Sequence, residues 1–166
     1  TDKIIDEALQ SKTQLYDKNS DYHYDTISAF IKSIRGSDPD AAIYWMAVML
    51  EGGEKPEFIL RRLIILASED IGNADPQALQ IAVAGFQATN IIGMPESAII
   101  LSQITAYLAS APKSNASYIA INKAQKKVRK NGTPDIPLHL RNATTNLMKE
   151  ENYGKGYKYP HNYSDK

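Results

Sequence analysis

Hydrophobic residues along this chain recur with the period of an α-helix. Four of them follow the spacing i, i+3, i+4 and i+7, namely Ile27, Phe30, Ile31 and Ile34. This spacing places them on one stripe of a helix over about residues 23–35. Similar apolar segments follow, separated by prolines and glycines, which fit the first turn of a helix and the residue after its last turn. The pattern predicts further helices over about residues 2–11, 39–51, 56–71, 76–92, 95–110 and 115–130.

Prolines mark four of these helix starts, in the pairs Asp38-Pro39, Lys55-Pro56, Asp75-Pro76 and Met94-Pro95. A proline in the first helical turn loses no hydrogen bond, and an aspartate before it accepts one from the first amides. No alternating, β-branched run between hairpin turns occurs. We therefore predict an all-α fold, a bundle of stacked helix hairpins followed by an extended C-terminal segment rich in Tyr, Lys and Gly.

The helix hairpin over residues 76–112 carries a single formal charge, Glu96. Helices that face water normally carry charged residues on that side, so this hairpin is expected to be covered on most faces. Two explanations for this cover are possible. The hairpin forms the middle of the domain's own core, or it contacts another subunit, since interface centres are depleted of charge. For the second case the candidate interface residues are Leu79, Val83, Phe86, Ile99, Ile100, Gln103 and Tyr107.

Charge divides the chain into two parts, although the formal net charge is zero. Residues 1–112 contain 8 Lys and Arg against 15 Asp and Glu, and residues 113–164 contain 10 against 3. Such asymmetry indicates either a polyanion at the basic end or head-to-tail attraction between copies. The basic helix is the candidate for DNA-phosphate contacts, against the alternative of a solvated helix end. Its cations lie on neighbouring turns and are Lys123, Lys126, Lys127, Arg129 and Lys130.

The C-terminal segment carries tyrosines at regular short intervals, at Tyr153, Tyr157, Tyr159 and Tyr163, with lysines and glycines between them. Three interpretations compete: stacking on nucleic-acid bases, packing on the domain's own surface, and a strap that reaches a neighbouring subunit. We favour the strap, with Tyr153, Tyr157 and Tyr159 as the rings that adhere to the helices of the same or a neighbouring copy.

Catalytic, nucleotide and metal sites find little support in the sequence. The chain has no cysteine, its three histidines are isolated, and the pattern Gly-x-x-x-x-Gly-Lys-Ser/Thr does not occur. Glu69-Asp70 is expected to be a solvated or salt-bridged pair. No stretch reaches the roughly 20 apolar residues of a membrane helix. We therefore expect no catalytic residue, cofactor or metal in these residues, no contact with a membrane, and a location in the cytoplasm.

Four stretches, in the same order along the chain, resemble the replication-associated recombination protein A family of AAA+ ATPases (MgsA/RarA type, related to the Werner-helicase-interacting protein). They are YDKNSDYHYDTISAFIKSIRGSDPDAAIYW, RRLIILASEDIGNADPQAL, YLASAPKSNASY and PLHLRNATTNLMKEENYGKGYKYPH. Together they span about residues 16–161. The chain departs from the family at residues 142–146, NATTN, where relatives often carry proline and lysine. The missing lysine weakens the case for this loop as a DNA contact.

The resemblance implies that the chain is the C-terminal part of a clamp-loader-like ATPase that acts in DNA replication, recombination and repair at stalled forks. It implies three segments: the end of an AAA+ lid helix at residues 1–11, a collar-like oligomerisation region at 12–112, and a basic helix with a family-specific segment at 113–166. It also implies a homotetramer, DNA as a partner, a location at the nucleoid, and ATP and Mg bound by an N-terminal part outside this chain. The alternative function is a helical scaffold that binds a protein such as single-strand binding protein.

Overall fold

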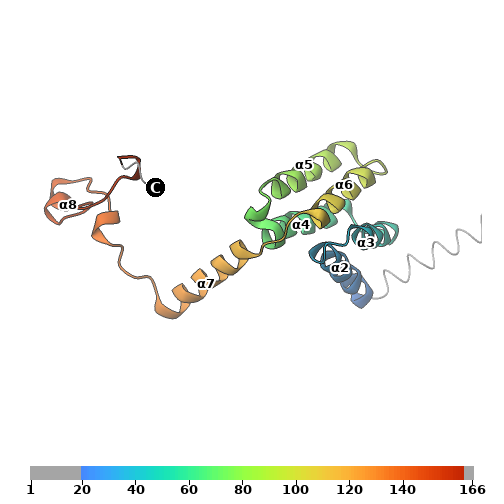
Figure 1. The fold of residues 1–166 in the computed structure, drawn as a ribbon, viewed down its shortest axis with the longest axis horizontal. Coiled ribbons are helices and arrows are strands. Elements are labelled where there is room, and N and C mark those ends of the chain that lie inside the picture. Colours follow the sequence, from blue (N-terminus) through green and yellow to red (C-terminus); the bar gives the residue numbers. More distant parts are fainter. Residues whose placement is uncertain (1–19, 163–166) are drawn as a thin grey trace, which may run out of the picture. The chain divides into compact units, whose positions relative to one another are not determined.

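The computed structural model of the chain describes residues 20–162, and these residues form helices and turns without a strand. The α-helices in Figure 1 are α2 (Ser20–Arg35), α3 (Pro39–Glu51), α4 (Pro56–Leu66), α5 (Gln77–Ile92), α6 (Ser97–Ser110), α7 (Ala116–Asn131) and α8 (Asn146–Glu150). Shorter helical turns are η1 (Ala67–Ile71), η2 (Gly72–Ala74), η3 (Leu138–Leu140) and η4 (Pro160–Asn162). The predicted all-α class is confirmed, while the helix predicted over 2–11 lies outside the described residues.

The chain divides into two compact units, residues 1–122 and residues 123–166, and the division falls inside α7. The first unit contains α2 to α6 and the first residues of α7. The second unit contains the remainder of α7, the short helix α8 and the tyrosine-rich segment. The domain boundaries expected after residues 11 and 112 stay predictions, and the first of them lies outside the part of the chain that the structure describes.

The starts of α3 and α4 follow the expected proline chemistry. The Asp38 side chain accepts a hydrogen bond from the Ala41 amide at 2.9 Å, which satisfies one of the amide groups left free at the helix start. Pro39 and Pro56 occupy the first positions of their helices, where no amide hydrogen is needed. Both helices therefore begin at the residues that the sequence predicts.

The starts of α5 and α6 depart from that prediction. Asp75 does accept a hydrogen bond from the Gln77 amide at 3.1 Å, but its neighbour Pro76 precedes α5. Pro95 precedes α6 and lies in the turn between the two helices, after a cis peptide bond. Helix α6 begins at Ser97, whose hydroxyl donates a hydrogen bond to the Gly93 carbonyl at 2.6 Å.

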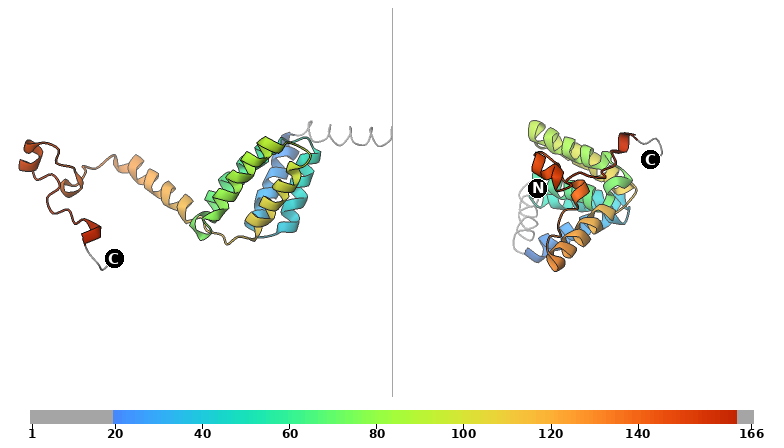
Figure 2. Two further views of the ribbon diagram at one scale, coloured as in Figure 1. Left: turned by 90° about the horizontal axis from the view of Figure 1, so that it is seen from above. Right: turned by 90° about the vertical axis from the view of Figure 1, so that its left-hand side faces the viewer.

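Helix α6 is the central helix of the first unit, because it contacts α2, α3, α4 and α5. Figure 2 shows α6 alongside α5 within this group of helices. The stripe predicted on α2 is confirmed by the low exposure of its four side chains, which is 8% at Ile27, 0% at Phe30, 4% at Ile31 and 0% at Ile34. The other large, fully buried apolar side chains of the core are Met49, Ile59, Leu60, Leu63, Leu66, Ile71, Leu101 and Leu108.

Gly85 allows α5 to approach α6 closely. A Cβ atom at this position would overlap the Cδ1 atom of Ile104 and would lie 3.1 Å from its Cγ1 atom and 3.4 Å from Cγ2 of Ile100. Ile104 is 2% exposed, so its side chain has little space into which it can move. The distance between the two helices therefore depends on the absence of a side chain at residue 85.

The second unit buries none of its described residues, 123–162. Its loop closes on itself through Arg141, which donates from Nε to the Ile136 carbonyl at 2.6 Å and from Nη1 to the Tyr153 hydroxyl at 3.2 Å. The Gly154 amide donates to the Leu138 carbonyl at 2.8 Å. These polar contacts hold a turn together without forming a core. Several large apolar side chains of this unit are exposed, among them Val128, Ile136, Leu138, Leu140 and Leu147.

Replacing Gly85 with alanine is expected to destabilise the chain by about 1–3 kcal/mol, because the added methyl group overpacks the contact with Ile104. At an open helical site the same change would stabilise the chain, by roughly 0.5–1 kcal/mol. The sign of the change in the free energy of unfolding, measured by urea denaturation, therefore tests the close contact. The exposed replacement Gln87→Ala on the same helix is the control and is expected to change stability by less than about 0.5 kcal/mol. A Gly85→Ala chain more stable than the parent would contradict the packing described here.

Candidate subunit interface and cationic helix

Helix α5 has one side against the core and one side uncovered. The buried side consists of small residues, Ala78, Ala82, Gly85 and Thr89. The opposite side carries apolar and amide side chains in place of charged ones, since the exposed residues of this helix include Leu79, Gln80, Val83, Gln87, Asn90 and Ile91. A helix face exposed in the single chain and bare of ionised groups resembles the centre of a protein interface more than an ordinary solvated surface.

The seven predicted interface residues divide into two groups. Four are exposed, with Ile99 at 72%, Leu79 at 41% and Val83 at 37%, together with Gln103. The other three, Phe86, Ile100 and Tyr107, are partly buried and pack against the core of their own chain. The first group is available to a partner. The second group is explained by packing within the chain.

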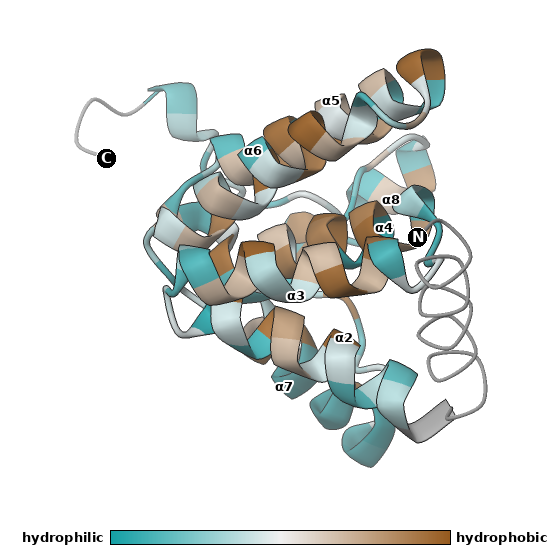
Figure 3. Cartoon of the chain, turned by 90° about the vertical axis from the view of Figure 1, so that its right-hand side faces the viewer, coloured by the Kyte–Doolittle hydropathy of each residue, from teal (hydrophilic) through white to brown (hydrophobic). Residues whose placement is uncertain are grey.

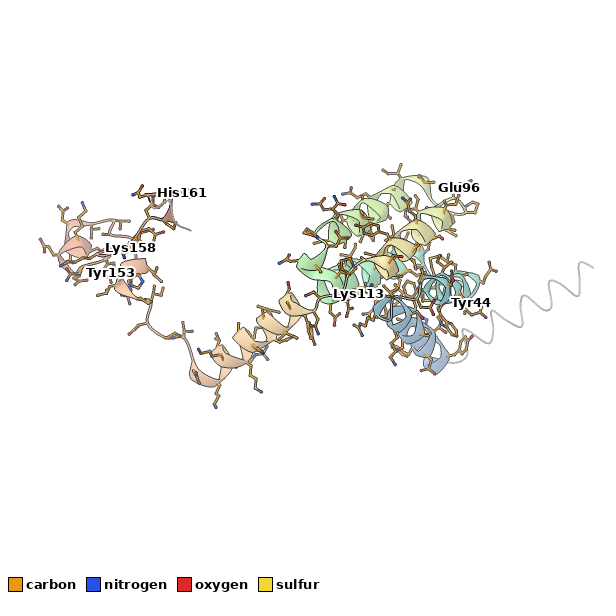
Figure 4. The ribbon with its side chains drawn as sticks, in the orientation of Figure 1. Tyr44, Glu96, Lys113, Tyr153, Lys158 and His161 are labelled. Carbon is orange, nitrogen blue, oxygen red and sulfur yellow. The ribbon has the colours of Figure 1, made fainter. Side chains whose placement is uncertain are left out.

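The turn between α5 and α6 carries the apolar residues that the sequence reasoning missed. Ile91 is 84% exposed, Ile92 is 53% exposed and Met94 is 49% exposed. Figure 3 shows strongly hydrophobic residues at the end of α5, and Figure 4 places the hairpin's single charged residue, Glu96, at the same turn. The sequence signal that predicts them is the pair of consecutive isoleucines, Ile91 and Ile92, followed by Gly-Met-Pro. Neighbouring residues of a helix point in different directions, so the two isoleucines cannot both face the same core.

We call the exposed large apolar residues of this hairpin the hairpin surface, which comprises Leu79, Val83, Ile91, Ile92, Met94 and Ile99. The two explanations given for the uncharged hairpin, packing in the chain's own core and contact with another subunit, apply to different parts of the hairpin. Helix α6 is covered over most of its length by its own chain, because it contacts four other helices of the first unit, and Ile99 in its first turn is left exposed. The outer side of α5 and the turn have no such cover within the described residues of that unit.

Tyr107 ties the end of α6 to the start of α5. Its hydroxyl donates a hydrogen bond to Oδ2 of Asp75 at 2.5 Å. This hydrogen bond raises the pKa of Tyr107 above its usual value, and desolvation and the charge of the Asp75 carboxylate act in the same direction. The hydrogen bond joins the two helices at the end of the hairpin opposite to Met94 and Ile99. It therefore stabilises the pair of helices that carries the hairpin surface.

A second polar contact joins α2 to the turn that precedes α5. Arg35 donates from Nε to Oδ1 of Asp70 at 2.8 Å, and its Nη2 atom lies 3.4 Å from Oε1 of Glu69. The salt-bridged pair expected at Glu69-Asp70 is thereby confirmed. Gly72 follows with φ of 53°, and a Cβ atom there would lie 3.3 Å from the Ser114 carbonyl oxygen. The Asp70 carbonyl accepts a hydrogen bond from the Ser114 amide at 2.8 Å, so this turn also holds the segment after α6.

A cavity of about 250 Å³ lies beside this ion pair and is lined by Arg35, Asp70, Lys113, Ser114 and Asn115. Its cations already have partners. The Lys113 ammonium donates to the carbonyls of Ala109 and Ala111 at 2.8 and 2.6 Å, and burial lowers its pKa below the usual value. Because these donors are occupied by the chain itself, the cavity is explained by the packing of the turn.

The five predicted phosphate contacts on α7 are all exposed. They are Lys123, Lys126, Lys127, Arg129 and Lys130, and α7 contains no acidic residue. The ion pairs found among the described residues belong to His23 and Arg35 and engage none of these five cations. The helix therefore presents positive charge that the described part of the chain does not neutralise.

The three predicted strap tyrosines differ in their surroundings. Tyr153 is partly buried, and its ring lies 5.2 Å from the guanidinium carbon of Arg141, which also donates to its hydroxyl. Tyr157 and Tyr159 are 53% and 52% exposed. Tyr163 lies outside the described residues. Tyr153 thus stabilises the local turn. The Tyr159 ring lies 5.0 Å from the His161 ring, centroid to centroid, so of the described strap tyrosines Tyr157 has the ring with the fewest contacts.

Within residues 20–162 no group of three or more His, Cys, Asp or Glu side chains is arranged to hold a metal ion. Among the helices that the structure describes, none combines the length and the apolar character needed to cross a membrane.

Two family models match the chain. Residues 36–166 match the family described as MgsA AAA+ ATPase C terminal, and residues 1–35 match the family described as AAA C-terminal domain. The boundary between the two matches falls between α2 and α3, although both helices belong to one packed core.

Similar proteins come from bacteria and from a eukaryote. Replication-associated recombination protein A of Coxiella burnetii is 47% identical over 99% of this chain and 37% of its own length. The protein of the same name from Escherichia coli strain K12 is 44% identical over 96% of this chain and 36% of its own length. ATPase WRNIP1 of Dictyostelium discoideum is 44% identical over 99% of this chain and 19% of its own length. The chain thus spans less than two fifths of the length of these relatives.

Replacing Arg35 with alanine is expected to lower the free energy of unfolding by about 1–2 kcal/mol, because Asp70, with a side chain 14% exposed, loses its charged donor. The gain from the ion pair itself is modest, since the Arg35 side chain is 42% exposed and screened by water. Urea denaturation measures the difference. The control is Lys32→Ala, which removes an exposed cation one turn earlier on α2. Equal stabilities of the two variants would show that the Arg35 contact does not hold the turn.

Proposed function

This chain belongs to the MgsA AAA+ ATPase family, of which it represents the C-terminal region, and from this premise we propose that it joins copies of its parent protein into an oligomer. The contact is made by the hairpin surface, on the outer side of α5 and the turn to α6. The region acts as a collar that keeps the subunits together. The assembly that we propose is a tetramer, as the family resemblance implies.

One observation carries this proposal: six large apolar side chains are exposed on a hairpin with a single formal charge. Full burial of each such side chain contributes roughly 1.5–3 kcal/mol, so their exposure in a lone chain leaves a considerable driving force for association. The amides of Gln80, Gln87, Asn90 and Gln103 lie among them and can form hydrogen bonds across a contact. Such a mixture of apolar and amide groups is typical of interface centres.

The remaining activities of the parent protein form part of the same proposal. ATP and Mg would be bound by a region that the relatives possess beyond the length matched here. The relatives named for replication-associated recombination support a role of the parent in DNA replication and recombination. We extend the proposal to DNA repair and to a location in the cytoplasm at the nucleoid. This chain would contribute assembly, with no catalytic residue of its own.

The paired replacement Val83→Lys/Ile91→Lys is expected to reduce self-association by at least about tenfold, because two buried apolar contacts become two desolvated, mutually repelling charges. Light scattering across a concentration series measures the effect. The matched control is Tyr44→Lys/Ile65→Lys, which changes two similarly exposed residues of α3 and α4, 63% and 49% exposed.

An unchanged mass distribution for the Val83→Lys/Ile91→Lys chain, or an equal loss in the control, would refute the hairpin surface as the subunit contact. If the unaltered chain is a monomer that binds purified single-strand binding protein and the variant does not, the scaffold alternative replaces the proposal.

A second proposal concerns DNA and depends on a separate observation, the five unneutralised cations on α7. Cations that approach phosphates release condensed counterions, so binding weakens steeply as salt rises. Lysine and arginine side chains of this kind contact phosphate oxygens without reading base sequence, so the proposed contact is to the DNA backbone. Tyr157, which is 53% exposed, is available for stacking on single-stranded bases.

Replacing Lys126, Lys127 and Lys130 with glutamine is expected to weaken binding of single-stranded DNA and to reduce the slope of log K against log salt by about 2, at roughly 0.7 per lost phosphate contact. Fluorescence anisotropy at several salt concentrations measures both quantities. The control is Lys32→Gln/Lys55→Gln/Arg61→Gln, which removes the same charge from exposed residues of the first unit. An equal effect in the control, or binding by the parent chain that does not respond to salt, would exclude α7 as the phosphate contact.

A further inference from the structure

Helix α7 has two opposite faces of different chemistry. At about 100° per residue, Tyr118, Ile121, Ala124 and Val128 fall on one side of the helix, while Lys123, Lys127 and Lys130 fall on the other. Arg129 falls at the edge of the first side, and Ile119 falls among the lysines. We call the first set the apolar face of α7. Phosphates would satisfy the lysine side. Phosphates cannot bury the apolar side, and an apolar partner is needed to remove it from water.

The apolar face of α7 is exposed within the units to which its residues belong. Tyr118 is 49% exposed, and Ile121 and Val128 are each 54% exposed. The helix has 16 residues, none of them buried. Isolated helices of about this length are marginal in water, because most helical stability in proteins comes from packing of an apolar face. A surface that covers this face would therefore stabilise the helix itself.

Charge decides which kind of surface fits. Residues 1–122, the first unit, contain 9 Lys and Arg against 15 Asp and Glu, a net charge of −6. Residues 123–166, the second unit, contain 10 against 4, a net charge of +6. Contacts between like units of two copies are opposed by charge repulsion, whereas contacts between unlike units are favoured. Because α7 extends into the basic second unit, the surface that covers it is expected on the acidic first unit of another copy.

On the first unit, the hairpin surface matches the apolar face of α7 in length and in chemistry. Helix α5 also has 16 residues, so the two helices have equal lengths of about 24 Å. Its outer side has no cation to repel the lysines of α7. The amides of Gln80 and Gln87 on α5 offer hydrogen bonds to Gln125, which lies between Ile121 and Val128 on α7. Both surfaces are apolar with amides, and each lacks a cover.

We propose that the apolar face of α7 in one copy docks on the hairpin surface of a second copy. This inference rests on the proposed oligomerisation function and names the segment that occupies its interface. The contact is head-to-tail, because two different surfaces meet, and repeated contacts of this kind close into a ring when the rotation between copies permits it. The lysine side of α7 then faces away from the interface, where it remains free for a polyanion.

The chain has no cysteine, so single introduced cysteines report this contact without background. A tagged chain with Val128→Cys is mixed with an untagged chain that carries Val83→Cys, and the mixture is treated with a short bis-maleimide. The control replaces Val128→Cys with Lys130→Cys, on the opposite side of α7. We expect at least about tenfold more tagged–untagged product for Val128→Cys than for Lys130→Cys, because docking raises the local concentration of the paired thiols.

Equal yields from the two α7 positions would overturn the inference. So would cross-linking of Val128→Cys chains mainly with one another, which would indicate that two α7 helices pair. The remaining alternative is that α7 docks on the hairpin surface of its own chain, and a chain that carries both Val83→Cys and Val128→Cys tests it. If the cross-linked product is mainly monomeric at concentrations where the chains associate, α7 covers its own hairpin and the inference is wrong. Light scattering of the same samples separates the two proposals, since an oligomer without the mixed product refutes only this inference, whereas a monomer refutes the proposed function as well.

Discussion

Apolar packing around α6 is the constraint on which the rest of the first unit depends. Because α6 contacts α2, α3, α4 and α5, most of its residues are buried or partly buried within the chain, and its lack of charge follows from that position. Helix α5 packs on α6 through small residues, with Gly85 directly against Ile104. This close contact turns the larger residues of α5, among them Leu79 and Val83, to the opposite side. The same packing that completes the core thus creates an uncovered apolar surface.

The core also joins two regions that sequence families treat as separate. Residues 1–35 and 36–166 match different families, yet α2, from the first region, supplies Ile27, Phe30, Ile31 and Ile34 to the core of the second. The ion pair between Arg35 and Asp70 adds a polar link across that boundary. The helix that ends the preceding region is therefore a structural part of this bundle.

Local features were predictable from the sequence, and features set by distant contacts were not. The stripe on α2, the start of α3 at Pro39 and the cationic character of α7 follow from spacing and from residue chemistry. The side of each hairpin helix that faces the core depends on which other helices surround α6, so Phe86, Ile100 and Tyr107 could not be separated from Leu79 and Ile99 in advance. The final turn of the helix predicted to residue 71 widens into η1, where Asp70 pairs with Arg35, 35 residues away in the sequence. Such a pairing leaves no signal in local periodicity.

The mass of the unaltered chain in solution tests the central claim most directly. Sedimentation equilibrium from about 1 to roughly 100 µM covers the range in which an apolar contact of ordinary interface size assembles. The account predicts a mass that rises with concentration to a multiple of the single-chain value, because burial of the hairpin surface drives the association. A single-chain mass over the whole range would contradict it.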